Sequence, residues 1–163
     1  DDAFGDLVRA YQHRVVNFTQ AMVSDRADAE DIAQEAFLRA EEENPEGVRF
    51  LPAYDEAMAR LAYAGAEAVL VPSRFEPCGL VQMIASRYGT PPVARAVGGL
   101  KDTVEDGRAG VLFETYHPEG LLYGVLRLFR LGAEEMGLRA MEKDFSWEGP
   151  ARAYREVYRE ALG

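Results

Sequence analysis

An alternation of short apolar runs with amphipathic helical stretches, which begins after Gly47, constrains the fold of this chain more than any other feature. The apolar runs lack the polar alternation of a half-exposed strand, which is typical of parallel strands buried on both faces. Strands that alternate with helices form parallel sheets with a helical layer on each face. We predict four strands, at Val48–Leu51, Ala68–Val71, Pro92–Ala96 and Gly110–Phe113. The helices that separate or follow them are expected at 55–63, 79–88, 99–105 and from 118 onward.

The first 44 residues show a different pattern, that of two amphipathic helices. Apolar side chains spaced by alternating steps of four and three residues mark one helical face from Phe4 to Met22. Asp25 is a suitable N-cap for a second helix, which we expect to end just before Pro45. The sequence therefore predicts an α/β protein with a helical hairpin at 1–44. The hairpin joins a partial Rossmann-like domain at 45–163, and the two parts form one merged globular unit.

Charge and composition exclude several classes of partner. Lys and Arg number 18 against 28 Asp and Glu, so the net charge is −10 and the field repels nucleic-acid backbones. No apolar run approaches the ~20 residues of a membrane-spanning helix. The acidic start at Asp1 and Asp2 argues against a secretory signal, and a single cysteine allows no internal disulfide. We expect a cytoplasmic protein with no nucleic-acid or membrane partner.

The strongest local signal for chemistry is the turn at 71–80, which follows a predicted strand and opens a helix. Gly79 permits close approach of a ligand to the backbone, and free N–H groups at a helix N-terminus attract anions. Glu76 can accept hydrogen bonds from hydroxyl groups. The turn thus suits a phosphate or a sugar, although Pro77 and Gly79 also fit a tight turn that binds nothing.

A second turn, at 96–102, follows the next predicted strand and carries Gly98 and Gly99. It belongs to the same carboxyl-terminal edge of the sheet, where ligands of open α/β folds bind. Tyr54 closes the first predicted strand at that edge, where its ring could stack on a base or simply cover the core. Two ordinary loops without a ligand are the alternative.

Neither a metal site nor a catalytic set is indicated. His13 and His117 have no ligand partners at suitable spacing, and they lie too far apart for a serine–histidine–acid arrangement. Cys78 stands beside a helix N-terminus, which can activate a thiol, but a structural role is favoured. We therefore expect no metal, no cofactor and no catalytic residue.

Several segments together carry a family resemblance: 72–80 (PSRFEPCGL), 87–90 (RYGT), 98–104 (GGLKDTV) and 144–147 (DFSW). On these motifs, residues 42–162 resemble the C-terminal, donor-domain part of bacterial glycogen synthases, which are retaining transferases with two Rossmann domains. The resemblance implies an ADP-glucose site in which Tyr54 stacks on adenine and Glu76 faces the glucosyl unit. The backbone of Cys78, Gly79 and Leu80 would hold the sugar hydroxyls.

Residues 4–40 resemble something unrelated, conserved region two of extracytoplasmic-function sigma factors. Segments 4–11 (FGDLVRAY) and 25–40 (DRADAEDIAQEAFLRA) carry this resemblance. In that family the second helix docks on a coiled coil of the polymerase clamp.

Both resemblances are partial, and this decides the function expected from sequence. The transferase-like part lacks the acceptor domain and the Arg and Lys that neutralise the diphosphate, whereas glycosyl transfer needs charge stabilisation in a closed cleft. We therefore expect an engineered chimera, a folded scaffold with no native catalytic activity and no required partner. One alternative is a vestigial, weak binder of ADP or ADP-glucose. Another is a polymerase-clamp or anti-sigma binding module that uses residues 25–40.

The parent fold also bears on the sheet. In a Rossmann order, loss of the first two strands separates Val48–Leu51 from Ala68–Val71 by two empty places. We expect the gap to close into a four-stranded parallel sheet in which these two strands pair directly. If an edge stays open, it could pair with a second copy in a homodimer.

Overall fold

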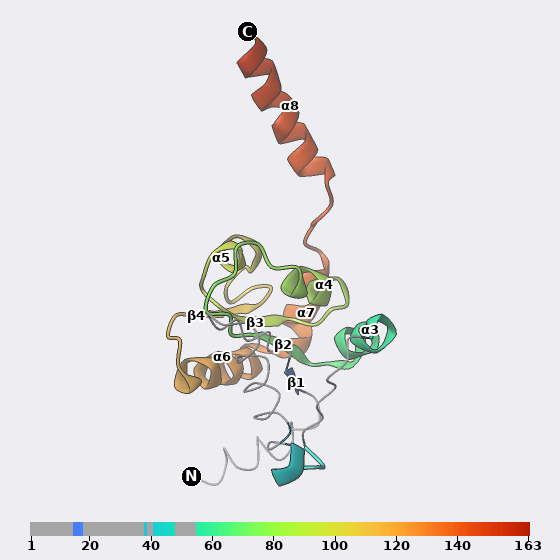
Figure 1. The fold of residues 1–163 in the computed structure, drawn as a ribbon, viewed down its shortest axis with the longest axis vertical. Helices are drawn as coiled ribbons and strands as arrows, with labels where there is room; N and C mark the ends of the chain where they lie inside the picture. Colours follow the sequence, from blue (N-terminus) through green and yellow to red (C-terminus); the bar gives the residue numbers. More distant parts are fainter. Residues whose placement is uncertain (1–14, 18–37, 39–40, 48–54) are drawn as a thin grey trace.

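A parallel sheet with helices on both faces forms the body of the protein (Figure 1). The computed structural model describes residues 15–17, 38, 41–47 and 55–163. The strand order is β1-β2-β3-β4, and each neighbouring pair is parallel. The strands are β1 (Val15–Asn17), β2 (Ala68–Val71), β3 (Pro92–Arg95) and β4 (Val111–Phe113). The helices are α3 (Glu56–Gly65), α4 (Val81–Arg87), α5 (Gly99–Thr103), α6 (Pro118–Leu131), α7 (Ala133–Met141) and α8 (Glu148–Leu162).

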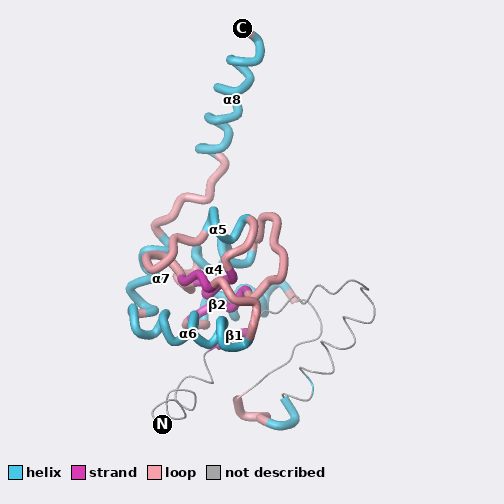
Figure 2. The backbone as a smooth tube through the Cα atoms, turned by 90° about the vertical axis from the view of Figure 1, so that its left-hand side faces the viewer, coloured by secondary structure: helices cyan, strands magenta, loops and turns pink. Residues whose placement is uncertain are grey.

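Alternate side chains of the strands enter two separate cores, one on each face of the sheet. Val69 and Val71 of β2 pack with Tyr63 of α3, and the same core includes residues of α4 and α5. Ala68 and Leu70 point to the other face, into a core built with α6 and α7. Figure 2 shows the sheet enclosed between these helices. The α/β class with helices on both faces is therefore confirmed, and the two-sided burial explains why the strands are almost wholly apolar.

Within the described residues the predicted strands appear as β2, β3 and β4, and β1 lies beside β2 where no strand was predicted. Val15–Asn17 forms β1 and pairs with β2 from Val15↔Ala68 to Asn17↔Leu70. The prediction of helix across these residues is wrong, because pairing with the edge of β2 stabilises the β-branched Val15 and Val16 as a strand.

This pairing also corrects the expected closure of the sheet. Because β2 has β1 on one side and β3 on the other, direct pairing of Val48–Leu51 with Ala68–Val71 is wrong. Val48–Leu51 itself lies outside the described residues, as do most of the predicted hairpin at 1–44 and Tyr54.

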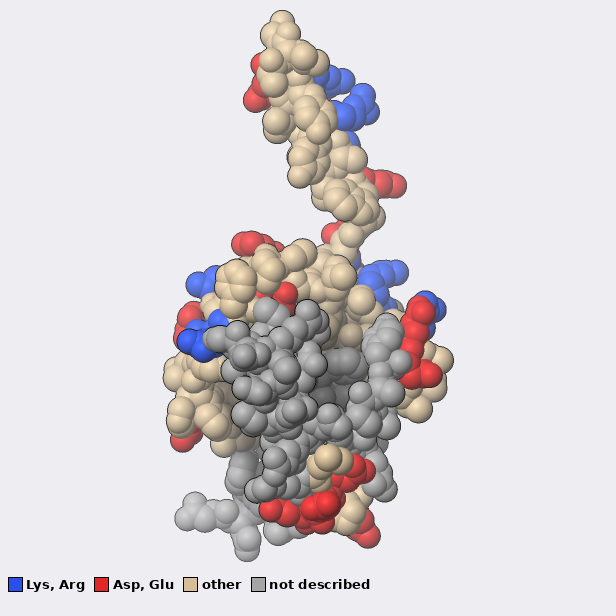
Figure 3. All heavy atoms as spheres, viewed as in Figure 1, with Lys and Arg blue, Asp and Glu red and all other residues tan. Residues whose placement is uncertain are grey.

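The last helix, α8, stands clear of the rest of the described chain (Figure 3). None of its residues is buried. Its exposed apolar side chains include Tyr154, Val157, Tyr158 and Leu162. Among the described residues, no helix is long and apolar enough to cross a membrane.

An ion pair fixes α6 to the loop before β4. Arg127 donates to both carboxylate oxygens of Asp106, at 2.6 Å and 3.0 Å, and the N–H of Leu112 donates to the same carboxylate at 2.9 Å. Burial raises the pKa of Asp106, but the hydrogen bonds from Arg127 and from Leu112 outweigh it and hold the pKa below its ordinary value of 3.8. Folding therefore favours the ionised carboxyl.

We predict that Asp106→Asn lowers the free energy of unfolding at neutral pH by about 1 kcal/mol, a modest figure because the Asp106 side chain is 42% exposed. A depressed pKa stabilises the fold fully above the unfolded value of 3.8, and this stabilisation is lost as the pH falls through the lower pKa of the folded protein. Urea unfolding across the acid range should show the wild type and the variant converging. A difference that persists unchanged in acid contradicts the assignment, and Glu148→Gln on α8 is the control.

Candidate functional site

The two turns singled out in the sequence meet at the carboxyl-terminal edge of the sheet. The loop 72–80 leaves β2 and enters α4, and the loop 96–98 leaves β3 and enters α5. The backbone N–H of Gly99 donates to the carbonyl of Glu76 at 3.0 Å. This bond joins the two loops directly, backbone to backbone.

Glycine is required at this junction because the neighbouring backbone leaves no space for a Cβ atom. A Cβ atom on Gly98 would collide with the carbonyl oxygen of Glu76, and Gly98 has a φ of +45°. A Cβ on Gly99 would lie 2.5 Å from the carbonyl oxygen of Cys78. Gly79, with a φ of +76°, supplies the other special backbone conformation of the first turn. The glycines therefore set how closely the turns approach.

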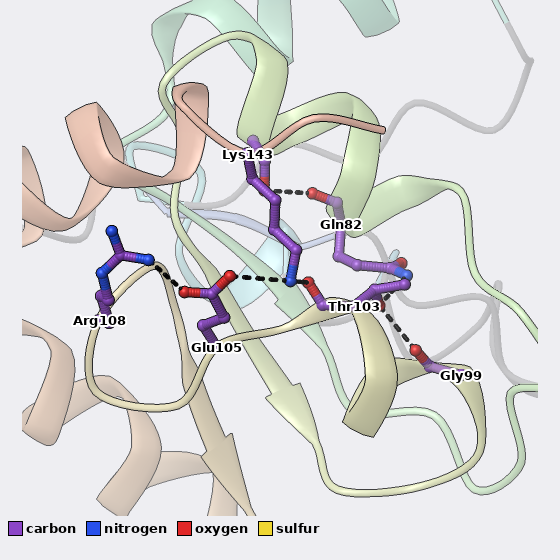
Figure 4. Close-up of polar contacts among 7 residues, drawn as sticks. Gln82, Gly99, Thr103, Glu105, Arg108 and Lys143 are labelled. Carbon is purple, nitrogen blue, oxygen red and sulfur yellow. Dashed lines mark hydrogen bonds and ion pairs between the residues drawn. The ribbon is translucent and has the colours of Figure 1, made fainter. Parts of the chain in front are cut away.

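A buried glutamine bonds to the first turn directly and reaches the second through Thr103, and sequence reasoning missed it. Gln82 is 1% exposed, and its Nε2 donates to the carbonyl of Gly79 at 2.9 Å and to that of Cys78 at 3.2 Å. The same Nε2 lies 2.9 Å from the Thr103 hydroxyl, which in turn donates to the carbonyl of Gly99 at 2.7 Å (Figure 4). One signal was available: Gln82 precedes Ala85 and Ser86 on the buried face of α4, where a polar residue is unusual.

A lysine that follows α7 bonds to the end of α5. Lys143, after α7, donates to the carbonyl of Thr103 at 2.9 Å and pairs with Glu105 at 3.3 Å (Figure 4). The hydrogen bond from Arg108, and then that from Lys143, hold the pKa of Glu105 below its ordinary value. The segment before the 144–147 motif is thereby anchored to the end of α5.

Arg95, at the end of β3, fixes the first part of the 72–80 loop. Its guanidinium donates to the carbonyls of Ser73 at 3.3 Å and Arg74 at 2.9 Å, and to that of Glu114 at 3.3 Å. It also lies 5.1 Å from the centroid of the Tyr116 ring. With its donors directed to loop carbonyls, Arg95 acts as a brace between β3 and the loops around it.

The predicted ligand-binding groups lie around this junction. The Glu76 side chain is half-buried and accepts a hydrogen bond from the Ser73 hydroxyl at 3.4 Å. Cys78 and Leu80 are exposed, and within residues 55–163 nothing accepts a hydrogen bond from the backbone N–H groups of residues 78–80. The structure thus brings Glu76, Cys78, Gly79, Leu80, Gly98 and Gly99 together. That they bind a ligand stays a prediction.

The arrangement suits recognition of a polar ligand. Backbone N–H donors next to a carboxylate can bind a molecule that carries both anionic oxygens and hydroxyl groups. Among the described residues, no cluster of three or more His, Cys, Asp or Glu side chains could hold a metal ion.

We predict that Gly98→Ala lowers the free energy of unfolding by more than about 3 kcal/mol, because a Cβ must displace the Glu76 carbonyl at a positive φ. Gly149→Ala in α8 is the matched control: a Cβ there meets nothing within 4 Å. It should leave stability unchanged or raise it by up to about 1 kcal/mol. Chemical unfolding of both variants measures the difference. Equal stability of the two variants would show that the turns tolerate separation.

Comparisons with known proteins identify what this site resembles. The family described as "Glycosyl transferases group 1" matches residues 2–130. Glycogen synthase of Thermus thermophilus is 99% identical over 130 residues, which are 80% of this chain and 30% of that protein. Glycogen synthase of an Anaeromyxobacter species is 47% identical over 77% of this chain and 29% of its own length. The catalytic domain of starch synthase IV from Arabidopsis thaliana, bound to ADP and acarbose, superposes with a TM-score of 0.72 at 35% identity. It covers 81% of this chain and 30% of that domain.

These findings confirm the resemblance to glycogen synthases and correct the expected function. The prediction of an engineered scaffold with no native activity is wrong, because four fifths of the chain is 99% identical to a natural glycogen synthase. The family match runs through residues 4–40 and across the expected junction near residue 44, so the sigma-factor resemblance and the polymerase-binding alternative gain no support. The chain spans about 30% of the length of these curated relatives.

Proposed function

We propose, because this chain belongs to the family of group 1 glycosyl transferases, that it forms the sugar-nucleotide side of an enzyme that transfers glucose from ADP-glucose to a growing glucan. The observation that carries the proposal is the junction of the two glycine turns beside Glu76, in a chain nearly identical to a glycogen synthase over most of its length. ADP is favoured as the nucleotide because the starch synthase neighbour was solved with ADP.

The chemistry of the site fits the two ends of such a donor. Backbone N–H groups of Cys78, Gly79 and Leu80 can donate to sugar hydroxyls or to phosphate oxygens, and these groups are held in place by Gln82. The Glu76 carboxylate can accept from a sugar hydroxyl, which its hydrogen bond from Ser73 helps to orient. The turns thereby fix the position of the glucosyl unit before transfer.

Transfer itself needs more than donor binding. A glycosyl cation-like transition state requires countercharge and exclusion of water, which a cleft between two lobes provides. We propose that the acceptor-binding groups and the cations that neutralise the diphosphate belong to the parts of the glycogen synthases beyond the 30% that this chain spans. The described residues then contribute binding and orientation of the donor.

The test is calorimetric titration of this chain with ADP, ADP-glucose and UDP-glucose. We predict that ADP-glucose binds in preference to UDP-glucose. Glu76→Gln should weaken ADP-glucose binding by about tenfold, the size of one charge-assisted hydrogen bond, and leave ADP binding within about twofold. The selective loss follows because we assign Glu76 to the sugar and not to the nucleotide.

Glu134→Gln, an exposed carboxylate on α7, is the control and should change neither affinity. Absence of heat with millimolar ADP and ADP-glucose would overturn the proposed function. An equal loss of ADP and ADP-glucose affinity in Glu76→Gln would overturn the role given to Glu76.

A further inference from the structure

We infer that Gln82 is a positioning residue: with Thr103 and Lys143 it forms a hydrogen-bonded relay that holds the two glycine turns at the spacing the donor needs. The inference rests on the proposed function for its ligand. The inference goes beyond the proposed function by assigning part of the donor affinity to three side chains that need not contact the donor. The relay consists of Lys143, Thr103 and Gln82, joined in that order through Thr103 (Figure 4).

Burial of the Gln82 amide is energetically unfavourable, so its N–H groups must make hydrogen bonds that offset the desolvation penalty. The side chain is 1% exposed, and within the described part of the chain its Oε1 is buried without a hydrogen-bond partner. Burial of an unpaired amide oxygen is unfavourable, and a leucine of similar size would avoid it. The Nε2 atom, however, reaches the carbonyls of Cys78 and Gly79 and the hydroxyl of Thr103. No apolar side chain could join these groups.

Thr103 passes the constraint to the second turn. Its single hydroxyl hydrogen goes to the carbonyl of Gly99 at 2.7 Å, so its oxygen is the acceptor for the Gln82 amide at 2.9 Å. Gly99 in turn donates its backbone N–H to Glu76. These hydrogen bonds form a closed circuit that links the two turns. A change in the spacing between the turns therefore requires at least one of these bonds to break.

Lys143 connects this circuit to the C-terminal part of the chain. Its Nζ lies 2.9 Å from the Thr103 carbonyl and 3.3 Å from Glu105, and the side chain is only 21% exposed. The carbonyl it bonds to belongs to the last residue of α5. Lys143 thus restrains the end of the short helix whose beginning is the second glycine turn.

The experiment separates positioning from general stability. We predict that Gln82→Leu and Thr103→Val each weaken ADP-glucose binding by at least about tenfold at a temperature where each variant stays folded, because each removes more than one of these hydrogen bonds. The double variant should be no weaker than either single variant, because both break one circuit. Thr103→Ser keeps the hydroxyl and should restore binding to within about twofold of wild type.

Thr90→Val is the matched control. Thr90 is 1% exposed and donates its hydroxyl to the carbonyl of Tyr63, with the carbonyl of Ala66 at 3.2 Å, away from both turns. It should lower the melting temperature without changing affinity. Wild-type affinity in Gln82→Leu, or equal losses in Thr90→Val and Thr103→Val, would overturn the inference.

Amide hydrogen exchange tests the relay in the absence of any ligand. Thr103→Val should raise exchange at the Gly99 amide, whose N–H donates to the Glu76 carbonyl across the junction, and leave α6 unchanged. If wild-type protein binds no nucleotide, the proposed function fails while this comparison still decides the relay. Unchanged exchange at the Gly99 amide would overturn the relay.

Discussion

The contact between the Gly99 N–H and the Glu76 carbonyl is the constraint on which the rest of the site depends. Neighbouring parallel strands lie about 4.8 Å apart, so loops leaving β2 and β3 can meet through their backbones only if no side chain stands between them. The glycines at 98 and 99 meet that condition. Once the loops are joined, the starts of α4 and α5 and the position of Glu76 follow.

Strands β2, β3 and β4 could be predicted from sequence because their signal is local. Ala68–Val71 was predicted with its observed bounds, and the next two strands differ from β3 and β4 by one residue each. The prediction for the N-terminal residues is wrong because their structure depends on a distant partner. Val15–Asn17 becomes a strand by pairing with a segment more than fifty positions away. The local spacing of apolar residues does not indicate such a distant partner.

The site residues divide in the same way, into those with a local sequence signal and those whose partners are distant in sequence. Glu76 and the glycines were visible because a tight strand-to-helix turn needs particular residues at particular places. Gln82 and Lys143 were not, since their bonds to Thr103 span 21 and 40 positions. The predicted chimera is wrong because it assigns two partial resemblances to two origins, whereas one family match covers residues 2–130.

Burial determines which member of the relay carries most of the energy. Outside the relay, beside Lys143, Glu105 is 39% exposed and Arg108 61% exposed, so their ion pair is screened by solvent and salt and contributes little. Within the relay the Gln82 amide is buried, where a hydrogen bond is stronger and an unmade one is costlier. The spacing of the turns therefore depends chiefly on neutral, buried hydrogen bonds, and ionic strength should disturb it much less than removal of a single hydroxyl.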